Sequence, residues 1–372
     1  MKICYLANAA SIHTQRWANY FAERDWKVDL ITWHPPGKDA EINANIDVHR
    51  LLFPPHYIAR YGALLEIALL IRRIHPDIIH AHYLAHFGIL AGLYSRLSGF
   101  RPIVLTAWGS DVITGAIGWK GWLIKHALKR ADLVTCDGIN LLKALTEMGT
   151  EPKKIHRIHW GVDTQRFNLR QRSERIRKSL GILNSPVVIS SKNLESVYDI
   201  ESLVRSIPLV LQKVPEAKFV IAGTGSREAQ LKQLVKSLGV SDSVRFVGFV
   251  PSDEFPKYLA SADIYVCTSL SDGGLAIATK EAMACGLPVI VTDLEVNTEW
   301  IENGEKGFVV PLRNPEALAE KIIYLIEHED MRVEFGKKGK KLVEERFEYN
   351  KEMQKIESIY EQLISEHKQR KC

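Results

Sequence analysis

The sequence has no long hydrophobic run and few cysteines. Its apolar segments, such as residues 88–93 and 287–291, are far shorter than the roughly 20 residues of a membrane-spanning helix. Residues 1–6 have the pattern of a short strand and not of a signal peptide, so we expect neither a transmembrane nor a secreted protein. The five cysteines are odd in number and widely spaced, which predicts no disulfide framework and no zinc knuckle. We therefore expect a reducing, cytoplasmic compartment.

The remaining composition is that of a globular protein with two domains. The chain has 372 residues, of which 46% are hydrophobic and 25% charged, so it can bury a large core. The charge is distributed unevenly. Residues 1–180 carry 25 Lys and Arg against 15 Asp and Glu, a net charge of +10, whereas the remaining residues carry 24 against 29, a net charge of −5. A basic half predicts an anionic partner, either nucleic acid or an anionic membrane surface.

Short strand-like segments alternate with helical patterns along both halves of the chain. They are residues 3–6, 28–32, 78–80, 103–106 and 133–136, then 187–190, 219–222, 244–247, 264–267 and 289–291. This alternation predicts parallel βαβ units, and hence an α/β fold of two Rossmann-like, doubly wound domains. Because ligands bind beyond the carboxyl ends of parallel strands, we search for functional residues in the loops there.

The alternation breaks between residues 163 and 180, where arginines crowd a stretch with little apolar period. We place a linker at residues 166–182, between an N-terminal domain at 1–165 and a C-terminal domain at 183–345; a solvated helix face is the alternative interpretation. Residues 346–372 are predicted to form a helix that packs back toward the N-terminal domain.

The segment 269–290 has the order strand, glycine loop, helix, glycine, proline and strand. Its glycines let a ligand approach the backbone closely, and the helix N-terminus favours a diphosphate. Glu281 lies about two turns inside this helix, where its carboxylate could accept hydrogen bonds from sugar hydroxyls. The alternative is an ordinary strand-to-helix turn with a surface glutamate.

Several ordered motifs resemble those of one enzyme family. They are residues 76–82, 160–163 with Phe167, 221–225, 244–250, 281–290 and 303–310. Over nearly the whole chain, the sequence resembles the retaining glycosyltransferases of family 4. The resemblance implies the GT-B fold, in which two Rossmann-like domains face each other across a cleft. The N-terminal domain would bind the acceptor, and the C-terminal domain would bind a nucleotide-diphosphate sugar.

The resemblance also assigns donor-binding residues. The family has two glutamates separated by seven residues, and Glu281 matches the second, which binds the donor ribose. The first position holds Gly273, so this chain resembles a Ser-Asp-Gly variant of the motif. Its neighbour Asp272 then takes part of the sugar-binding role or caps a turn. Gly274 and Leu275 complete the donor-binding loop.

The family neutralises the diphosphate with an Arg and a Lys, but Asn193 and Tyr198 stand at these positions. Lys192 is the cation of this loop and our candidate for the catalytic stabilisation of the leaving diphosphate; the alternative is a solvated surface lysine. Arg227 is the weaker second candidate. Two loop residues are further expected to contact the donor, Gly223 and Phe249.

The acceptor side is expected in the first domain. His13, Arg16 and Trp108 are the candidate acceptor-binding residues, and Asp111 is the candidate catalytic hydrogen-bond partner of the acceptor. Because relatives often have His where Trp108 stands, the family's catalytic histidine is absent here. His13 could instead be a capped loop residue, and Trp108 could stack on a sugar or merely pack.

Three histidines, His80, His82 and His86, have the spacing of a metal cluster. No further set of ligands follows a later strand, so we interpret them as structural or acceptor-side residues. We expect no metal and no cofactor.

The segment 117–130 combines Trp, Leu and Lys or Arg without any acid, as interfacial segments do. It predicts contact with an anionic membrane surface; the alternative is a surface helix whose tryptophans pack into the core. Nucleic acid is not expected, because aromatic residues are not interleaved along a strand platform.

These observations predict a retaining glycosyltransferase that uses a UDP-sugar or GDP-sugar and acts on a hydroxyl of a glycan or lipid-linked acceptor. We expect the enzyme to take part in polysaccharide or glycolipid biosynthesis. We expect it in the cytoplasm, bound peripherally to the inner face of the membrane. Two alternatives stay open: a GT-B sugar-nucleotide epimerase or hydrolase, and a non-catalytic sugar-nucleotide-binding module.

Overall fold

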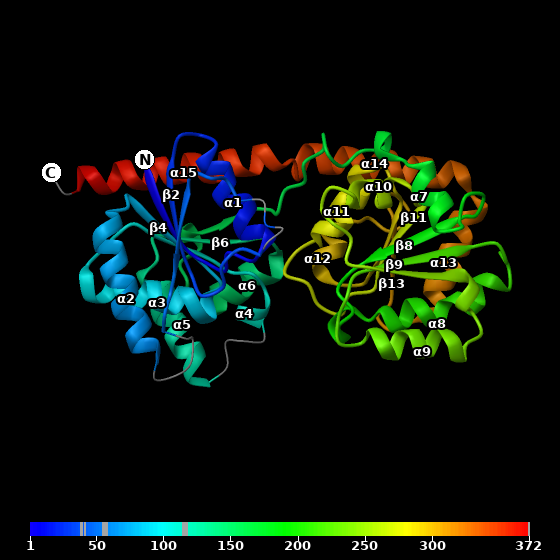
Figure 1. Cartoon of the computed structure of the whole chain (residues 1–372), viewed down its shortest axis with the longest axis horizontal. Coiled ribbons are helices and arrows are strands. Elements are labelled where there is room, and N and C mark those ends of the chain that lie inside the picture. Colours follow the sequence, from blue (N-terminus) through cyan, green and yellow to red (C-terminus); the bar gives the residue numbers. More distant parts are fainter. Residues whose placement is uncertain (38–39, 41, 54–58, 114–117, 371–372) are drawn as a thin grey trace. The chain divides into compact units, whose positions relative to one another are not determined.

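The computed structural model describes residues 1–37, 40, 42–53, 59–113 and 118–370. The chain divides into two compact units (Figure 1). Unit 1 comprises residues 1–159 and 352–372, and unit 2 comprises residues 160–351. Unit 1 is therefore built from two segments that lie far apart in the sequence.

The described part of unit 1 contains a seven-stranded parallel sheet in the order β3-β2-β1-β4-β5-β6-β7. Its strands are β1 (Lys2–Leu6), β2 (Lys27–Thr32), β3 (Ile46–Arg50), β4 (Ile78–His82), β5 (Ile103–Thr106), β6 (Leu133–Cys136) and β7 (Ile155–Arg157). Its helices are α1 (Ile12–Ala22), α2 (Ala59–Ile74), α3 (Ile89–Ser98), α4 (Ser110–Ile113), α5 (Gly118–Arg130), α6 (Ile139–Glu147) and α15 (Tyr349–Gln369), the last of which begins in unit 2. The central strands β4 and β5 are buried along their whole length, as expected of parallel strands covered on both faces.

Unit 2 contains a six-stranded parallel sheet in the order β10-β9-β8-β11-β12-β13. Its strands are β8 (Val187–Ser191), β9 (Lys218–Ala222), β10 (Val244–Gly248), β11 (Ile264–Cys267), β12 (Val289–Thr292) and β13 (Phe308–Val310). Its helices are α7 (Glu174–Ser179), α8 (Ile200–Leu211), α9 (Glu228–Ser237), α10 (Phe255–Ala260), α11 (Ile277–Ala284), α12 (Glu295–Thr298), α13 (Pro315–Glu327) and α14 (Glu329–Arg346). Helices α8, α9 and α13 pack in one apolar cluster, and α10 and α11 belong to another.

These two sheets confirm the prediction of an α/β fold with two Rossmann-like domains. All ten strand-like segments of the sequence lie in or along observed strands. Local signals also agree: the Asn314 side chain accepts a hydrogen bond from the Ala317 amide, and Pro315 is the first residue of α13.

Helix α15 supplies the last layer of unit 1. The Tyr360 hydroxyl lies 2.6 Å from His80 Nδ1, and its ring stacks on Phe21 with centroids 5.3 Å apart. Near the end of the helix, Lys368 Nζ lies 3.0 Å from a carboxylate oxygen of Asp77. The expected C-terminal helix thus packs within unit 1 from residue 352 onward.

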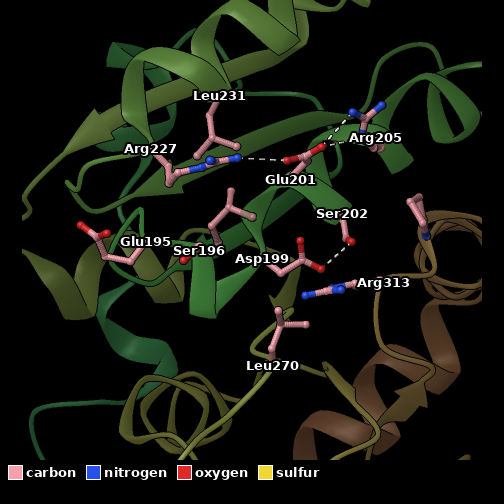
Figure 2. Close-up of a pocket in the computed structure, with 12 residues that line it drawn as sticks. Glu195, Ser196, Asp199, Glu201, Ser202, Arg205, Arg227, Leu231, Leu270 and Arg313 are labelled. Atoms are coloured by element: carbon pink, nitrogen blue, oxygen red, sulfur yellow. Dashed lines mark hydrogen bonds and ion pairs between the residues drawn. The ribbon is translucent and has the colours of Figure 1, made fainter. Parts of the chain in front are cut away.

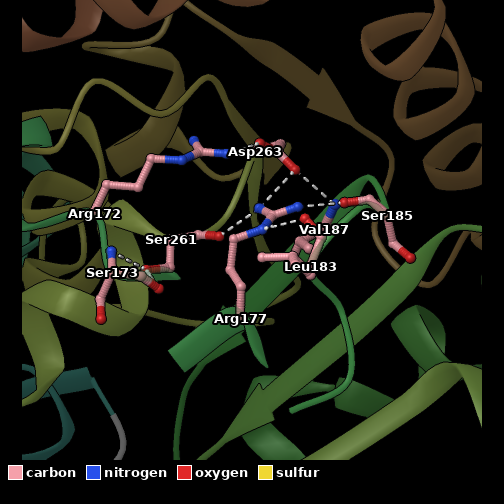
Figure 3. Close-up of polar contacts among 8 residues, drawn as sticks. All are labelled: Arg172, Ser173, Arg177, Leu183, Ser185, Val187, Ser261 and Asp263. Carbon is pink, nitrogen blue, oxygen red and sulfur yellow. Dashed lines mark hydrogen bonds and ion pairs between the residues drawn. The ribbon is translucent and has the colours of Figure 1, made fainter. Parts of the chain in front are cut away.

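The expected linker at 166–182 lies instead inside unit 2, and the chain passes between units at 159–160 and 351–352. Arg177 explains the difference (Figure 3). It is 5% exposed, and its guanidinium donates to the carbonyl oxygens of Leu183, Ser185 and Ser261. Asp263 pairs with Arg177 at 3.4 Å and accepts the Val187 amide at 2.9 Å. Arg177 and its partner Asp263 therefore tie the segment to the start of β8.

The corrected boundary weakens the charge asymmetry. Unit 1 carries 23 Lys and Arg against 17 Asp and Glu, a net charge of +6, and unit 2 carries 26 against 27, a net charge of −1. Several of the positive charges assigned to the first half belong to unit 2.

Candidate active site

Lys192 and Asp272 meet at the carboxyl edge of the unit 2 sheet. They follow the neighbouring strands β8 and β11, and Lys192 Nζ lies 3.1 and 3.2 Å from the two carboxylate oxygens of Asp272. Both side chains are mostly buried, and the Tyr198 ring lies 4.8 Å from the ammonium. Burial alone would lower the pKa of Lys192, but the ionisable groups around it, among them Cys267 and Asp272, raise it above its ordinary value. Lys192 is thus a positively charged group and not a solvated surface lysine.

The glycine loop after β9 packs directly against the backbone that follows β8. Gly223 has a φ of +130°, and a Cβ atom there would lie 2.2 Å from the Lys192 carbonyl oxygen. A side chain at Gly223 would therefore displace the backbone that carries Lys192. The Gly223 amide donates to the Gly248 carbonyl at 2.7 Å, which joins this loop to the end of β10. The next residue, Phe249, is 76% exposed.

The loop after β11 leads into α11, which carries Glu281. Glu281 is partly exposed, whereas the preceding Lys280 is fully buried with its Nζ 4.9 Å from the Phe347 ring centroid. Gly273 is partly exposed and Gly274 is buried. Leu275 is 2% exposed and belongs to the core, so only its backbone is available to a ligand.

Arg227 faces a separate pocket of about 420 Å³ in unit 2 (Figure 2). A guanidinium nitrogen of Arg227 lies 3.4 Å from Glu201, which also pairs with Arg205 at 2.8 Å. Asp199 and Arg313 line the same pocket. Among the described residues that line it, neither Lys192 nor Asp272 occurs, so the two candidate cations do not share a pocket. Sequence reasoning missed this set because its members have the pattern of ordinary helix-surface charges.

A second pocket, of about 440 Å³, lies at the carboxyl edge of the unit 1 sheet. It is lined by loops that follow β1, β2, β4 and β5, together with the first turn of α1. The lining residues are Asn8, Ser11, Thr14, Trp33, His34, His82, Tyr83, His86, Phe87 and Trp108. We call it the unit 1 pocket. Trp33 stacks on Phe87 there, with ring centroids 4.4 Å apart.

The predicted acceptor residues lie around this pocket in different roles. Trp108 lines it, and His13 packs edge-on against the Trp108 ring at a centroid distance of 5.4 Å. Arg16 lies on α1 and is partly exposed. Asp111 is fully buried and accepts hydrogen bonds from the backbone amides of Leu84, Trp108 and Gly109 at 2.7 to 3.0 Å. Its carboxylate therefore holds two loops in place and does not line the pocket.

Burial raises the pKa of Asp111, although the three amides counteract this effect. Asp111 thus acts on the site through the position of Trp108 and of the short π-helix at Leu84–Gly88.

The histidines of β4 are buried and paired with neutral groups. His80 lies 2.6 Å from Thr106 Oγ1 as well as from the Tyr360 hydroxyl, and His82 Nδ1 lies 3.5 Å from Thr14 Oγ1. Burial, with a smaller contribution from His13, lowers the pKa of His82 to about 3, and burial likewise holds the pKa of His80 well below its ordinary value. Within the described residues, no cluster of His, Cys, Asp or Glu has a geometry that could hold a metal ion.

The predicted membrane segment corresponds to α5, and its first residue, Ile117, lies outside the described residues. Trp119 and Trp122 are 49% and 58% exposed, so they do not pack into the core. Trp122 instead lines a pocket of about 350 Å³ together with basic side chains, Arg96, Arg101, Lys129 and Arg130. No helix in the described ranges is long and apolar enough to cross a membrane. The four described cysteines are buried free thiols, and Cys372 lies outside the described residues.

Comparisons with known proteins agree with this architecture. The family model "Glycosyl transferase 4-like" matches residues 2–138, and "Glycosyl transferases group 1" matches residues 172–342. The chain is 27% identical over 358 residues to the N-acetyl-alpha-D-glucosaminyl L-malate synthase of Bacillus anthracis, covering 93% of this chain and 92% of that protein. It is 30% identical over 262 residues to a GDP-mannose-dependent alpha-(1-6)-phosphatidylinositol monomannoside mannosyltransferase of Mycobacterium tuberculosis, covering 67% and 66%.

Among solved structures, the chain resembles Anabaena HepE in complex with UDP, with a TM-score of 0.83 and 19% identity over 98% of this chain and 100% of that one. Its two parallel-sheet units and the paired family models define a glycosyltransferase of the GT-B fold. The chain belongs to the family 4 glycosyltransferases, which confirms the resemblance seen in the sequence.

Proposed function

We propose that this enzyme is a retaining glycosyltransferase that moves a hexose from a nucleoside diphosphate sugar to a hydroxyl group of a glycan or lipid-linked acceptor. The observation that carries the proposal is the clustering of Lys192 and the glycine loop at Gly223 along one sheet edge of unit 2, with the Glu281 helix following the next strand. The relatives support a nucleotide donor, because one is named for GDP-mannose and a structural neighbour was solved with UDP. Relatives are also named for alpha linkages, as retention at an α-configured donor produces.

The proposed reaction breaks the bond between the anomeric carbon and the diphosphate oxygen and forms a bond from that carbon to the acceptor oxygen. The acceptor attacks from the face that the diphosphate leaves, and the leaving phosphate oxygen takes the hydroxyl proton. Negative charge grows on the diphosphate as the bond breaks, so the Lys192 ammonium stabilises the transition state more than the bound donor. Asp272, beside Lys192, is then placed to contact the donor sugar.

Glu281 provides the direct test of donor binding. We expect Glu281→Ala to weaken UDP or GDP binding by about 1.5–3 kcal/mol, because a charge-assisted hydrogen bond to the ribose is lost. Calorimetric titration of both nucleotides into the full chain would also identify the base. Glu327→Ala on the exposed surface of α13 is the matched control. Unchanged affinity in a folded Glu281→Ala protein would remove this residue from the site.

Product analysis separates transfer from the alternative chemistries. An epimerase would return an isomeric nucleotide sugar and a hydrolase a free sugar, whereas the proposed enzyme forms a new α-glycoside. We also propose that catalysis needs no metal, so dialysis against EDTA should leave the rate unchanged.

We further propose that α5 brings unit 1 to anionic membranes, because exposed Trp119 and Trp122 lie beside Lys125, Lys129 and Arg130. This would place the enzyme peripherally on the inner face of the membrane. Sedimentation should be stronger with anionic than with neutral vesicles, should weaken with salt, and should fall in the variant combining Trp119→Ala and Trp122→Ala. Equal sedimentation with both kinds of vesicle, or none with either at low salt, would contradict contact with an anionic membrane and favour a soluble acceptor.

A further inference from the structure

The described residues that line the unit 1 pocket offer polar groups but no Lys or Arg that could pair with an anion. Among the ten described residues that line it, none is Asp, Glu, Lys or Arg. The polar members are hydroxyl, amide and imidazole groups, and the remaining walls are aromatic rings. A pocket of about 440 Å³ has the size of a small-molecule site. Its composition disfavours a carboxylate or phosphate as the ligand, because such an anion would lose its hydration in the pocket without pairing with a Lys or Arg side chain.

His82 is the buried polar group of this pocket that lacks a full set of partners. Its side chain is 1% exposed; Nδ1 faces Thr14 Oγ1, and Nε2 is buried without a hydrogen-bond partner among the described residues. Such a group costs free energy and is uncommon in folded proteins. Because burial keeps the imidazole neutral, Nε2 is either a donor or an acceptor according to the proton on Nδ1. A hydroxyl group matches either state, since it can both donate and accept.

We propose that the unit 1 pocket binds a neutral sugar ring of the acceptor, and that His82 is the residue that selects it by a hydrogen bond to one ring hydroxyl. This inference rests on the proposed function, because it names the acceptor class of that transfer. The aromatic walls suit the apolar face of a pyranose: Trp108 lies with its ring centroid 5.7 Å from that of His82, and Trp33 and Phe87 form a stacked pair. His82 is a binding residue and not the base, because a pKa of about 3 makes the neutral imidazole a poor acceptor for the proton of a hydroxyl group.

The assignment separates this chain from a relative of similar length. The Bacillus anthracis protein is named as an N-acetyl-alpha-D-glucosaminyl L-malate synthase, and malate carries two carboxylates. The described lining of the unit 1 pocket, which has no Lys or Arg, does not suit such an acceptor. We therefore expect neutral glycosides to bind here and L-malate not to bind.

The test is a titration of the full chain, with and without UDP, followed by tryptophan fluorescence and calorimetry. The probes are the methyl α- and β-glycosides of glucose, galactose, mannose and N-acetylglucosamine, with L-malate and glycerol 3-phosphate as anionic comparisons. We expect at least one glycoside to bind and both anions to fail. His82→Phe should weaken the glycoside by roughly tenfold or more, and His82→Gln, which retains a polar group, should weaken it less.

His126→Phe, on the surface of α5, is the control and should leave glycoside binding unchanged. Trp108→Ala is a second test of the pocket and should weaken glycoside binding independently of His82. UDP affinity should be the same in every variant. If UDP binds but no glycoside does, or if His82→Phe folds and binds as wild type, the inference fails while the proposed function stands. If wild type binds neither UDP nor GDP, the proposed function fails, and the titration without nucleotide still decides whether the pocket binds sugars.

Discussion

The two units bury polar groups in different ways at the edges of their sheets. Unit 1 buries the neutral imidazoles of His80 and His82 against hydroxyl groups. Unit 2 contains two largely buried cations that are held by an opposite charge: Lys192 by Asp272, and Arg177 by Asp263. A buried charge is tolerated only with a partner, whereas a neutral imidazole needs only a hydrogen bond. The candidate site of unit 2 therefore holds a charged pair, whereas the described residues that line the unit 1 pocket include no Asp, Glu, Lys or Arg.

This difference also defines the resting state of Lys192. Its ammonium is already engaged by Asp272, so a diphosphate must compete with that carboxylate or bind beside it. The pair holds the lysine side chain in place in the absence of donor, which reduces the conformational entropy lost on binding.

The largest effect is expected where a buried charge loses its partner. Arg177→Ala removes the buried arginine that pairs with Asp263 and the donor to three carbonyl oxygens, and should lower the free energy of unfolding by about 3–5 kcal/mol. Urea denaturation followed by circular dichroism measures this change. Arg175→Ala, on the exposed side of α7, should change the stability by less than about 0.5 kcal/mol. Equal effects of the two substitutions would restore the interpretation of residues 166–182 as a linker.

The second-largest effect is expected on the rate of transfer, and it tests the charge of Lys192 in unit 2. Lys192→Ala should lower the single-turnover rate of transfer by about a hundredfold while weakening donor binding much less, because the lysine acts mainly on the developing charge. Lys257→Ala, which removes an exposed partner of Glu254, is the control. A wild-type rate in Lys192→Ala would shift the catalytic role to backbone donors or to Arg227.

The smallest effect concerns the neutral histidines of unit 1. Their folded pKa values lie below the unfolded value near 6.5, with His82 at about 3. At acid pH the unfolded chain binds protons that the folded chain does not, so stability is complete above pH 6.5 and falls as the pH drops toward 3. Between pH 7 and pH 5, His82 should lower the free energy of unfolding by about 2 kcal/mol, and His80 acts in the same direction.

Denaturation of wild type and His82→Gln at both pH values checks this prediction. The variant should lose the part of the pH dependence that His82 causes, about 2 kcal/mol between the two pH values. An unchanged dependence would mean that the buried imidazoles do not govern it.

The fold could be predicted because the sequences of buried parallel strands are short, apolar segments rich in β-branched residues. Strand β3 was missed because it lies at the sheet edge and most of its side chains are exposed, so it lacks that pattern. The linker was wrong for a related reason: a run of arginines has the composition of a solvated segment, and only tertiary contacts show that Arg177 is buried.

The site could be predicted in part. Lys192, Gly223 and Asp272 follow neighbouring strands, and parallel topology brings such loops together. The partnership of Lys192 with Asp272 could not be predicted, because the sequence separates them by 80 positions. Likewise, no local pattern reveals that Asp111 serves three backbone amides or that Arg227 faces another pocket.

The return of α15 to unit 1 has a consequence for the order in which the protein acquires its structure on the ribosome. The side chain that contacts His80 and Phe21 belongs to Tyr360, which is synthesised after the whole of unit 2. At about 5–20 residues per second, the roughly 190 residues between the two segments of unit 1 take on the order of 10–40 s to translate. Throughout that interval unit 1 lacks the helix that contacts Phe21 and His80, while unit 2, continuous in the sequence, can finish first.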